Sequence, residues 1–285
     1  MRVLVLGLVC FVTAVWGGDA CAVEIQLRRT AGNVPFGLIG EVGSGKAPAP
    51  TLFVIAHGLD VMRTEEVYTE VAVQLAREGW VCVILEPPCH GEDVVPGEPK
   101  YLEGWRSRVE RDQEFIGAFT AKGRAVLDLL IAEKVADPDR VAVYGTSRGG
   151  FLAYHLAAAE PRIKAAAGVS PVTRLTALRE FSGMKDPAKA EQWDVARLGS
   201  KLAGRAIWLS IGNNDLRVNC DDAIAFTRSV VRASARPDKP EAIIPVELLV
   251  GPAAGHTKIE KAHERLAEWL RKTVLLRPDE TPGGR

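Results

Sequence analysis

The fold is decided by one short stretch of the chain, Val141-Ala142-Val143-Tyr144-Gly145-Thr146-Ser147-Arg148-Gly149-Gly150. An apolar run typical of a β-strand leads directly into Gly-x-Ser-x-Gly, and a helix-forming run over residues 151–157 follows. This order of strand, sharp turn and helix is the context in which the serine of that motif is a nucleophile. A side chain at Gly145 or Gly149 would crowd the neighbouring strand and helix. We therefore interpret Ser147 as a nucleophile at the carboxyl edge of a sheet.

The composition around this stretch is that of one large α/β domain. The chain has 285 residues, of which 47% are hydrophobic and 25% charged, and its formal net charge is zero. That length is ample for a sizeable core. Acidic and basic residues are interspersed, so the sequence carries no electrostatic footprint for nucleic acid or for an anionic membrane surface. We expect no nucleic-acid partner.

The first residues, 1–22, have the layout of a secretory signal peptide. A short positive start precedes a nearly continuous apolar run over residues 3–15, and small residues follow, with cleavage expected after Ala20 or Ala22. The apolar run is too short for a comfortable transmembrane helix. We expect a secreted or periplasmic protein with no integral membrane segment after leader removal. An uncleaved anchor, a buried N-terminal strand and lipid modification at residue 21 are the less favoured alternatives.

The mature chain is expected to form one domain over residues 23–277, followed by a disordered tail over 278–285. Removal of the leader leaves four cysteines, Cys21, Cys82, Cys89 and Cys220. Four cysteines allow three pairings, and the sequence does not choose among them. Cys89 adjoins a histidine, but no second pair stands at ligand spacing, so we expect no metal. The chain also lacks a dinucleotide fingerprint and a zinc-protease motif, so we expect no cofactor.

Apolar runs alternate with helix-forming segments along most of the chain. Such alternation predicts a mostly parallel sheet of about eight strands with helices on both faces, a three-layer α/β sandwich. The expected strands cover residues 24–30, 34–42, 51–56, 80–85, 141–146, 163–170, 206–212 and 244–250, and the expected helices cover 63–78, 115–134, 151–157, 221–233 and 258–272. Residues 137–139 are expected to form a turn and 96–111 to be irregular. Residues 173–202 are expected to form a small cap over the site, with a plain crossover as the alternative.

Chemically active side chains follow three of these strands, in the chain order Ser147, Asp215, His256. That order is the one found in α/β-hydrolases. We predict that His256 is the general base, and that Asp215 orients its imidazole and offsets the positive charge that forms there. The backbone amides of Leu59, just past a central strand, and of Arg148, just past the nucleophile, are the predicted oxyanion donors.

Loops at the carboxyl ends of parallel strands border the ligand crevice in open α/β sheets. The candidate pocket residues are therefore His57, His90, Glu92, Trp105 and Trp193. A structural role in holding its loop is the favoured interpretation of His57. A solvated turn is the alternative for His90 and Glu92, and plain packing is the alternative for Trp105.

Four motifs together resemble the α/β-hydrolase superfamily over essentially the whole mature length: His57-Gly58, the elbow at residues 145–150, Gly212-Asn213-Asn214-Asp215 and Gly255-His256. The Ser-Arg-Gly-Gly elbow and the Cys-His-Gly-Glu loop at residues 89–92 are similar to dienelactone-hydrolase-like and prolyl-oligopeptidase-like esterases. There is no His-Gly-Gly-Gly run, which disfavours the hormone-sensitive-lipase type of oxyanion loop.

This resemblance implies a serine carboxylesterase that acts on small-molecule esters through an acyl-enzyme. A peptidase or a dienelactone-type hydrolase is the alternative. A catalytically silent hydrolase fold that binds a ligand or partner is the alternative from another class. The natural substrate, the acyl length and the oligomeric state stay open at this stage.

Overall fold

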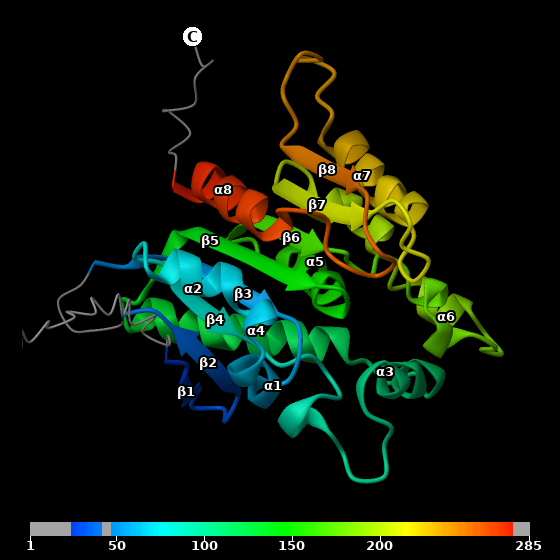
Figure 1. Cartoon of the computed structure of the whole chain (residues 1–285), viewed down its shortest axis with the longest axis horizontal. Coiled ribbons are helices and arrows are strands. Elements are labelled where there is room, and N and C mark those ends of the chain that lie inside the picture. The colour runs from blue at the N-terminus through cyan, green and yellow to red at the C-terminus, as the bar shows by residue number, and fades with distance from the viewer. Residues whose placement is uncertain (1–23, 42–46, 276–285) are drawn as a thin grey trace, which may run out of the picture.

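One mostly parallel sheet organises the molecule (Figure 1). The structure, a computed structural model, describes residues 24–41 and 47–275. The predicted leader and the predicted tail therefore lie outside the described residues, as does Cys21. The strands of the sheet are β1 (Gln26–Arg29), β2 (Pro35–Ile39), β3 (Ala49–Ile55), β4 (Val81–Ile84), β5 (Ala136–Thr146), β6 (Ile163–Val169), β7 (Ala206–Gly212) and β8 (Val246–Gly251).

The strands lie in the order β1-β2-β4-β3-β5-β6-β7-β8. β1 pairs with β2, and β2 with β4, in antiparallel fashion, whereas every further pair from β4 to β8 is parallel. The predicted sheet of about eight mostly parallel strands is confirmed. The carboxyl ends of β3 to β8 consequently meet along one edge, where the parallel topology places a ligand crevice.

Helices cover both faces of the sheet because side chains alternate between its faces. Leu52 and Tyr144 face α1 (Leu59–Thr64), α2 (Glu70–Ala76) and α8 (Ala262–Leu275) in one buried cluster. Phe53 and Val143 belong to the opposite cluster, which includes residues of α3 (Tyr101–Glu110), α4 (Ile116–Ala132), α5 (Arg148–Ala159) and α7 (Cys220–Ser234). The three-layer arrangement follows.

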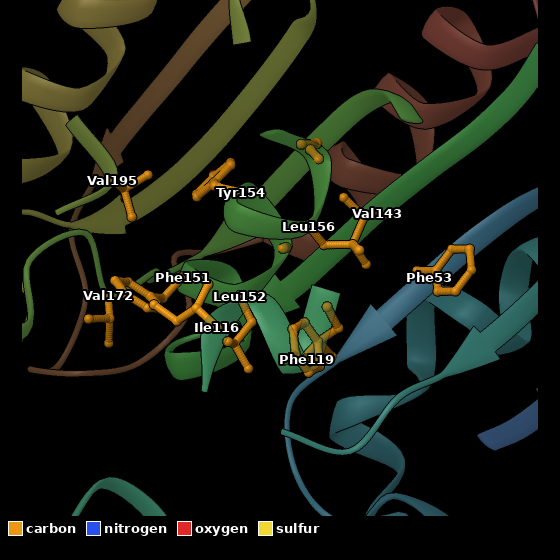
Figure 2. Packing of buried hydrophobic residues seen from close by; sticks show 14 of the residues in the cluster. Phe53, Ile116, Phe119, Val143, Phe151, Leu152, Tyr154, Leu156, Val172 and Val195 are labelled. Carbon is orange, nitrogen blue, oxygen red and sulfur yellow. The ribbon is translucent and has the colours of Figure 1, made fainter. Parts of the chain in front are cut away.

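The larger of the two clusters packs densely between the sheet and helices α4 and α5 (Figure 2). Figure 2 shows Phe53 and Val143 of the sheet, Phe119 of α4 and Leu156 of α5 among these side chains. Burying one such side chain stabilises a fold by about 1.5–3 kcal/mol. Gly123 weakens α4 as an isolated helix, but a Cβ there would meet Leu156 at 2.7 Å. Its glycine therefore allows α4 to approach α5.

The predicted helix over residues 63–78 is broken into α1, a short turn η1 (Glu66–Tyr68) and α2. The chain leaves the helical region at Glu65, whose φ is −108° and ψ is 94°. The apolar spacing continues across this break, so periodicity alone did not reveal it. The predicted turn at residues 137–139 is likewise absorbed into β5, which starts at Ala136.

Residues 96–111 were expected to be irregular, and that expectation is wrong, because α3 occupies most of this range. Trp105 lies fully buried in α3. Its ring stands 5.4 Å from that of Phe115 and 5.8 Å from that of Phe151. Gly104, which obscured the helix in the sequence, is required by packing, since a Cβ there would meet Cys89 Sγ at 2.7 Å.

Between β6 and β7 lies the insertion of residues 173–202. It contains the short elements η3 (Leu175–Ala177), η4 (Arg179–Phe181), α6 (Ala188–Glu191) and η5 (Val195–Leu202). Phe181 and Leu202 are buried, which fastens the insertion to the main core. A further turn, η2 (Gly91–Asp93), follows β4. Within the described residues, no helix combines the length and apolar character needed to span a bilayer.

Candidate active site

Ser147 stands on a sharp turn between β5 and α5, with φ 52° and ψ −116°. This backbone conformation is strained for a residue with a side chain. Hydrogen bonds to the chain at the end of β6 help to hold it: Ser147 N donates to Val169 O at 2.9 Å, and Val172 N donates to Ser147 O at 3.0 Å. A Cβ at Gly145 would collide with the backbone of Gly149, and one at Gly149 would collide with strand β3. The glycines of the motif are therefore required sterically.

A continuous chain of hydrogen bonds starts at this serine. His256 Nε2 lies 2.9 Å from Ser147 Oγ, and His256 Nδ1 lies 2.8 Å from Asp215 Oδ2. Because a carboxylate only accepts hydrogen bonds, Nδ1 carries the hydrogen and Nε2 is left to accept from the serine hydroxyl. Asp215 is buried, and its other oxygen accepts from the backbone N–H groups of Arg217 at 3.0 Å and Val218 at 3.2 Å.

Segments that follow three strands at the same edge of the sheet supply these residues. Ser147 directly follows β5, Asp215 lies in a tight turn after β7, and His256 lies in the loop after β8. The turn at Asp215 closes through its N–H on Gly212 O at 3.2 Å. Gly255, with φ 64°, turns the loop immediately before the histidine. The structure thus brings together the three residues that the sequence singled out.

The two N–H groups that were predicted to bind an oxyanion differ in whether they already donate a hydrogen bond. Among the described residues the Arg148 N–H, the first of α5, has no hydrogen-bond acceptor. The Leu59 N–H instead donates to Glu86 Oε1 at 2.8 Å. Leu59 is the first residue of α1, so its N–H is one that a helix leaves unsatisfied, and Glu86 supplies the missing acceptor. In this conformation Leu59 does not offer the N–H that the sequence analysis assigned to it.

Two hollows adjoin the serine. The Ser147 pocket has a volume of about 250 Å³ and is lined by residues that include Tyr68, Ser147, Arg148, Arg217, His256 and Lys258. The outer pocket has about 690 Å³ and is lined by residues 176–179 and Ser182 of the insertion, together with Asn214, Leu216, Arg217, Gly255 and His256. Arg217 and His256 line both, and Ser147 lines only the first.

None of the five predicted pocket residues lines either hollow. Trp105 belongs to the core, and its Nε1 donates to Pro88 O at 2.7 Å. Trp193 packs near His155, whose Nε2 lies 2.9 Å from Trp193 O. Glu92 forms an exposed ion pair with Arg29. These positions correct the expectation that the three side chains form the pocket wall.

His57 and His90 lie behind the pocket, in contact with each other at 5.1 Å between ring centroids. His90 Nε2 lies 2.8 Å from Arg148 Nη1, and His90 Nδ1 lies 2.9 Å from Pro88 O. Burial lowers the pKa of His90 to about 3. Burial also lowers the pKa of His57, and the charge of Arg148 adds to that effect. Both imidazoles are therefore neutral near pH 7.

Tyr68, Arg217 and Lys258 are the site residues that the sequence analysis missed. Arg217 lies two positions after Asp215, and Lys258 two after His256, on the loops that carry those residues. That spacing was an available signal. Tyr68 gave none, because it belongs to η1 in the break of the expected helix.

In the described part of the chain, no group of three or more histidine, cysteine or acidic side chains is placed to hold a metal. Cys82, Cys89 and Cys220 are free thiols. Burial raises the pKa of Cys82 above its usual range and that of Cys89 to about 11. These two buried thiols are therefore protonated and unreactive near neutral pH.

A search of curated proteins finds no match to the chain. Among solved structures, TT1662 from Thermus thermophilus is similar with a TM-score of 0.64 and 17% identity, covering 89% of this chain and 100% of that one. The acylaminoacyl peptidase of Pyrococcus horikoshii gives a TM-score of 0.64 and 13% identity, covering 90% and 42%. A cold-adapted esterase from an Arctic intertidal metagenomic library gives 0.60 and 17%, covering 88% and 93%.

At these identities the similarity establishes the α/β-hydrolase fold, as the sequence predicted. The chain spans 35% to 42% of the length of the longer structures that it matches. The model of the prolyl oligopeptidase family matches residues 123–275, more than half of the chain. The matched range holds the elbow, the acid turn and the histidine loop described above. The chain therefore belongs to the prolyl oligopeptidase family.

Proposed function

We propose that the protein is a serine hydrolase that cleaves carboxylic esters of small acyl groups through an acyl-enzyme on Ser147. The observation that carries the proposal is the hydrogen-bond chain from Asp215 Oδ2 through His256 to Ser147 Oγ, with links of 2.8 and 2.9 Å. This arrangement both removes a proton from the serine and holds the imidazole in the tautomer that can accept it.

In the proposed reaction, Ser147 Oγ attacks the ester carbonyl while His256 Nε2 takes its proton. Asp215 offsets the positive charge on the imidazole. The tetrahedral intermediate collapses when its C–O bond to the alcohol breaks and His256 returns the proton to that oxygen. A water molecule, deprotonated by His256, then attacks the acyl-serine and releases the acid and the free hydroxyl of Ser147.

The Arg148 N–H is proposed to bind the oxyanion of that intermediate, since it is adjacent to the nucleophile and lacks an acceptor among the described residues. Such a donor typically contributes ~100–1,000-fold in rate. Leu59 can add a second N–H only when the Glu86 carboxylate turns away from it.

The two hollows suggest how the substrate lies. The acyl group is proposed to occupy the Ser147 pocket, which the acylated serine lines, and its volume of about 250 Å³ favours a short acyl chain. The leaving group is proposed to extend into the outer pocket, which His256 lines but Ser147 does not. That placement suits a histidine that protonates the departing oxygen.

A peptidase is the second candidate function. It is favoured by the family to which the chain belongs and by the outer pocket of about 690 Å³, which has room for the amine portion of a peptide. Export to the periplasm or the medium is also part of the proposal, and it rests on the sequence of residues 1–22 alone.

Labelling with a fluorophosphonate probe tests the hydrolase proposal. We expect one adduct on the purified protein, mapped to Ser147, and none on Ser147→Ala. The exposed Ser200→Ala serves as the matched control and is expected to label like the parent. No adduct on folded parent protein would instead favour a catalytically silent fold that binds a ligand.

A panel of short-chain esters and of matched amides then separates the two candidate functions. An esterase is expected to turn over the esters at least about 100-fold faster per molecule than the amides, a difference of about 2.7 kcal/mol in the activation barrier. Comparable turnover of peptides would favour the peptidase.

A further inference from the structure

The arginine and lysine side chains that line the Ser147 pocket are not matched by any carboxylate in its lining. Three cationic side chains line it, Arg148, Arg217 and Lys258, and no carboxylate does. Asp215 lies close by but is buried behind His256 and is engaged by it. A substrate that enters this pocket therefore meets positive charge next to the nucleophile.

Two of these cations are already neutralised. Arg217 Nη2 lies 2.6 Å from Glu180 Oε1, and Lys258 Nζ lies 3.0 Å from Glu70 Oε2. The hydrogen bond from Arg217 lowers the pKa of Glu180, although burial opposes it. These pairs account for the charges of Arg217 and Lys258 without any ligand.

Arg148 is different, because within the described residues no carboxylate lies within 4.0 Å of its guanidinium. Its side chain donates instead to His90 Nε2 at 2.8 Å. That nitrogen is a neutral acceptor, since His90 Nδ1 donates to Pro88 O. The guanidinium also lies over the Tyr101 ring, 5.9 Å from its centroid. These contacts orient the Arg148 guanidinium but do not pair it with a carboxylate.

The charge persists in this setting. Burial lowers the pKa of Arg148, and the charge of Arg217 acts in the same direction, whereas Tyr68, Glu180 and Tyr101 oppose this shift. An arginine nevertheless stays protonated in proteins. A half-buried, oriented cation beside a second cation is a site that an anion would stabilise.

Resting on the proposed hydrolase function, we propose that the substrate is a half-ester of a short dicarboxylic acid, whose free carboxylate binds the Arg148 guanidinium in the Ser147 pocket. The planar fork of an arginine matches a carboxylate with two parallel hydrogen bonds. Arg148 follows the nucleophile directly, so the free carboxylate and the scissile carbonyl belong to one short acyl group. Hydrolysis of the half-ester anion consumes one water and yields an alcohol, a dicarboxylate and one proton.

The test compares two esters of the same shape, monoethyl glutarate and ethyl glutaramate, in which an amide replaces the free carboxylate. Acid release is followed by titration, and kcat/KM is measured for both on the parent protein. A hydrogen bond to a charged group is worth about 1.5–3 kcal/mol. We therefore expect the anionic ester to be preferred by roughly 10- to 100-fold.

Arg148→Gln removes the charge and keeps the backbone N–H. It is expected to bring the ratio of the two kcat/KM values to within about twofold of one. Arg228→Gln, an exposed arginine on α7, removes the same charge elsewhere and is expected to keep the parent ratio.

The outcomes separate this inference from the function on which it rests. Equal turnover of both esters by a parent protein that labels at Ser147 overturns the inference and leaves the hydrolase standing. Failure to label at Ser147 and to cleave either ester overturns both. The ratio of the two kcat/KM values is measured on the parent protein without any variant. If the parent shows no preference for the anionic ester, the inference fails, whether or not Arg148→Gln folds.

Discussion

The Glu86 carboxylate joins two loops at the edge of the active site. Its Oε1 accepts from Leu59 N at 2.8 Å, and its Oε2 accepts from Glu92 N at 3.2 Å. It packs against Gly91, whose φ of 48° and lack of a side chain leave room for it. Both N–H groups belong to the first turns of helical segments, so this one side chain caps two of them.

Glu86→Ala leaves both N–H groups without an acceptor. We expect the free energy of unfolding to fall by about 1–3 kcal/mol, the usual cost of an orphaned donor, as measured by urea denaturation. Because the change also frees the Leu59 N–H, kcat for a short ester, corrected by active-site titration, is not expected to fall.

The exposed Glu66→Ala on η1 is the control and is expected to change stability by less than about 0.5 kcal/mol. A tenfold loss of kcat in Glu86→Ala would contradict the interpretation of Glu86 as a cap and assign it a part in the reaction.

At this scale the sequence predicted the three side chains of the hydrogen-bond chain but not the engagement of the Leu59 N–H. Ser147, Asp215 and His256 each follow a strand, and their order along the chain is the one found in α/β-hydrolases. The structure brings these three side chains within hydrogen-bond distance. The availability of the Leu59 N–H depends on a carboxylate 27 positions away, and no local pattern announces such a contact.

Among the elements, the junction of α5 with β3 is the tightest at the site. Gly149, in the first turn of α5, lies against the carbonyl of Ile55 at the end of β3, where a Cβ would collide with it. The helix that carries the nucleophile therefore rests directly on the backbone of the adjacent strand.

Gly149→Ala is expected to destabilise the fold by roughly 3 kcal/mol, because two backbones would have to separate to admit the methyl group. Urea denaturation measures the loss. Gly32→Ala is the control, because a Cβ there meets nothing closer than 3.8 Å. Equal stability of the two variants would show that the junction yields easily.

The insertion of residues 173–202 contains Asp194, an acid with a buried carboxyl oxygen, at the start of η5. Asp194 Oδ1 is buried without a hydrogen-bond partner among the described residues. Burial raises the pKa of Asp194 to about 6. Because the folded pKa lies above the unfolded one, the unfolded chain binds fewer protons between these values, and folding becomes less favourable as pH rises.

Asp194→Asn removes that penalty. We expect its Tm to exceed the parent Tm at pH 8 by a few degrees, and the difference to vanish as pH falls through about 6 toward the ordinary aspartate pKa of about 4. Asp139→Asn, an exposed acid in β5, should show no such trend. A constant difference between parent and Asp194→Asn at every pH would refute the assignment.

The buried strands were the elements that the sequence predicted best, because each central strand is a continuous apolar run. The break at Glu65 and the helix α3 were not predicted. In α3, tertiary packing of Gly104 against Cys89 decides a conformation that local preference leaves open.

For the whole molecule, the alternation of apolar runs was sufficient to predict a mostly parallel sheet between two layers of helices. The wall of the Ser147 pocket was not predictable in the same way. Among its polar side chains, Tyr68, Arg148, Arg217 and Lys258 lie on four separate segments. Which of the many arginines and lysines of the chain lie near Ser147 is set only when the sheet edge is assembled.

Ser147 and His256, the proposed nucleophile and base, lie far apart along the chain and are therefore made at different times during synthesis. Ser147 lies near the middle of the 285-residue sequence, whereas His256 lies 109 positions later, in the loop between β8 and α8. A growing polypeptide that has only reached α7 contains Ser147 but not yet His256. In the proposed mechanism, Ser147 therefore gains its base only after β8 and the loop that follows it have been made.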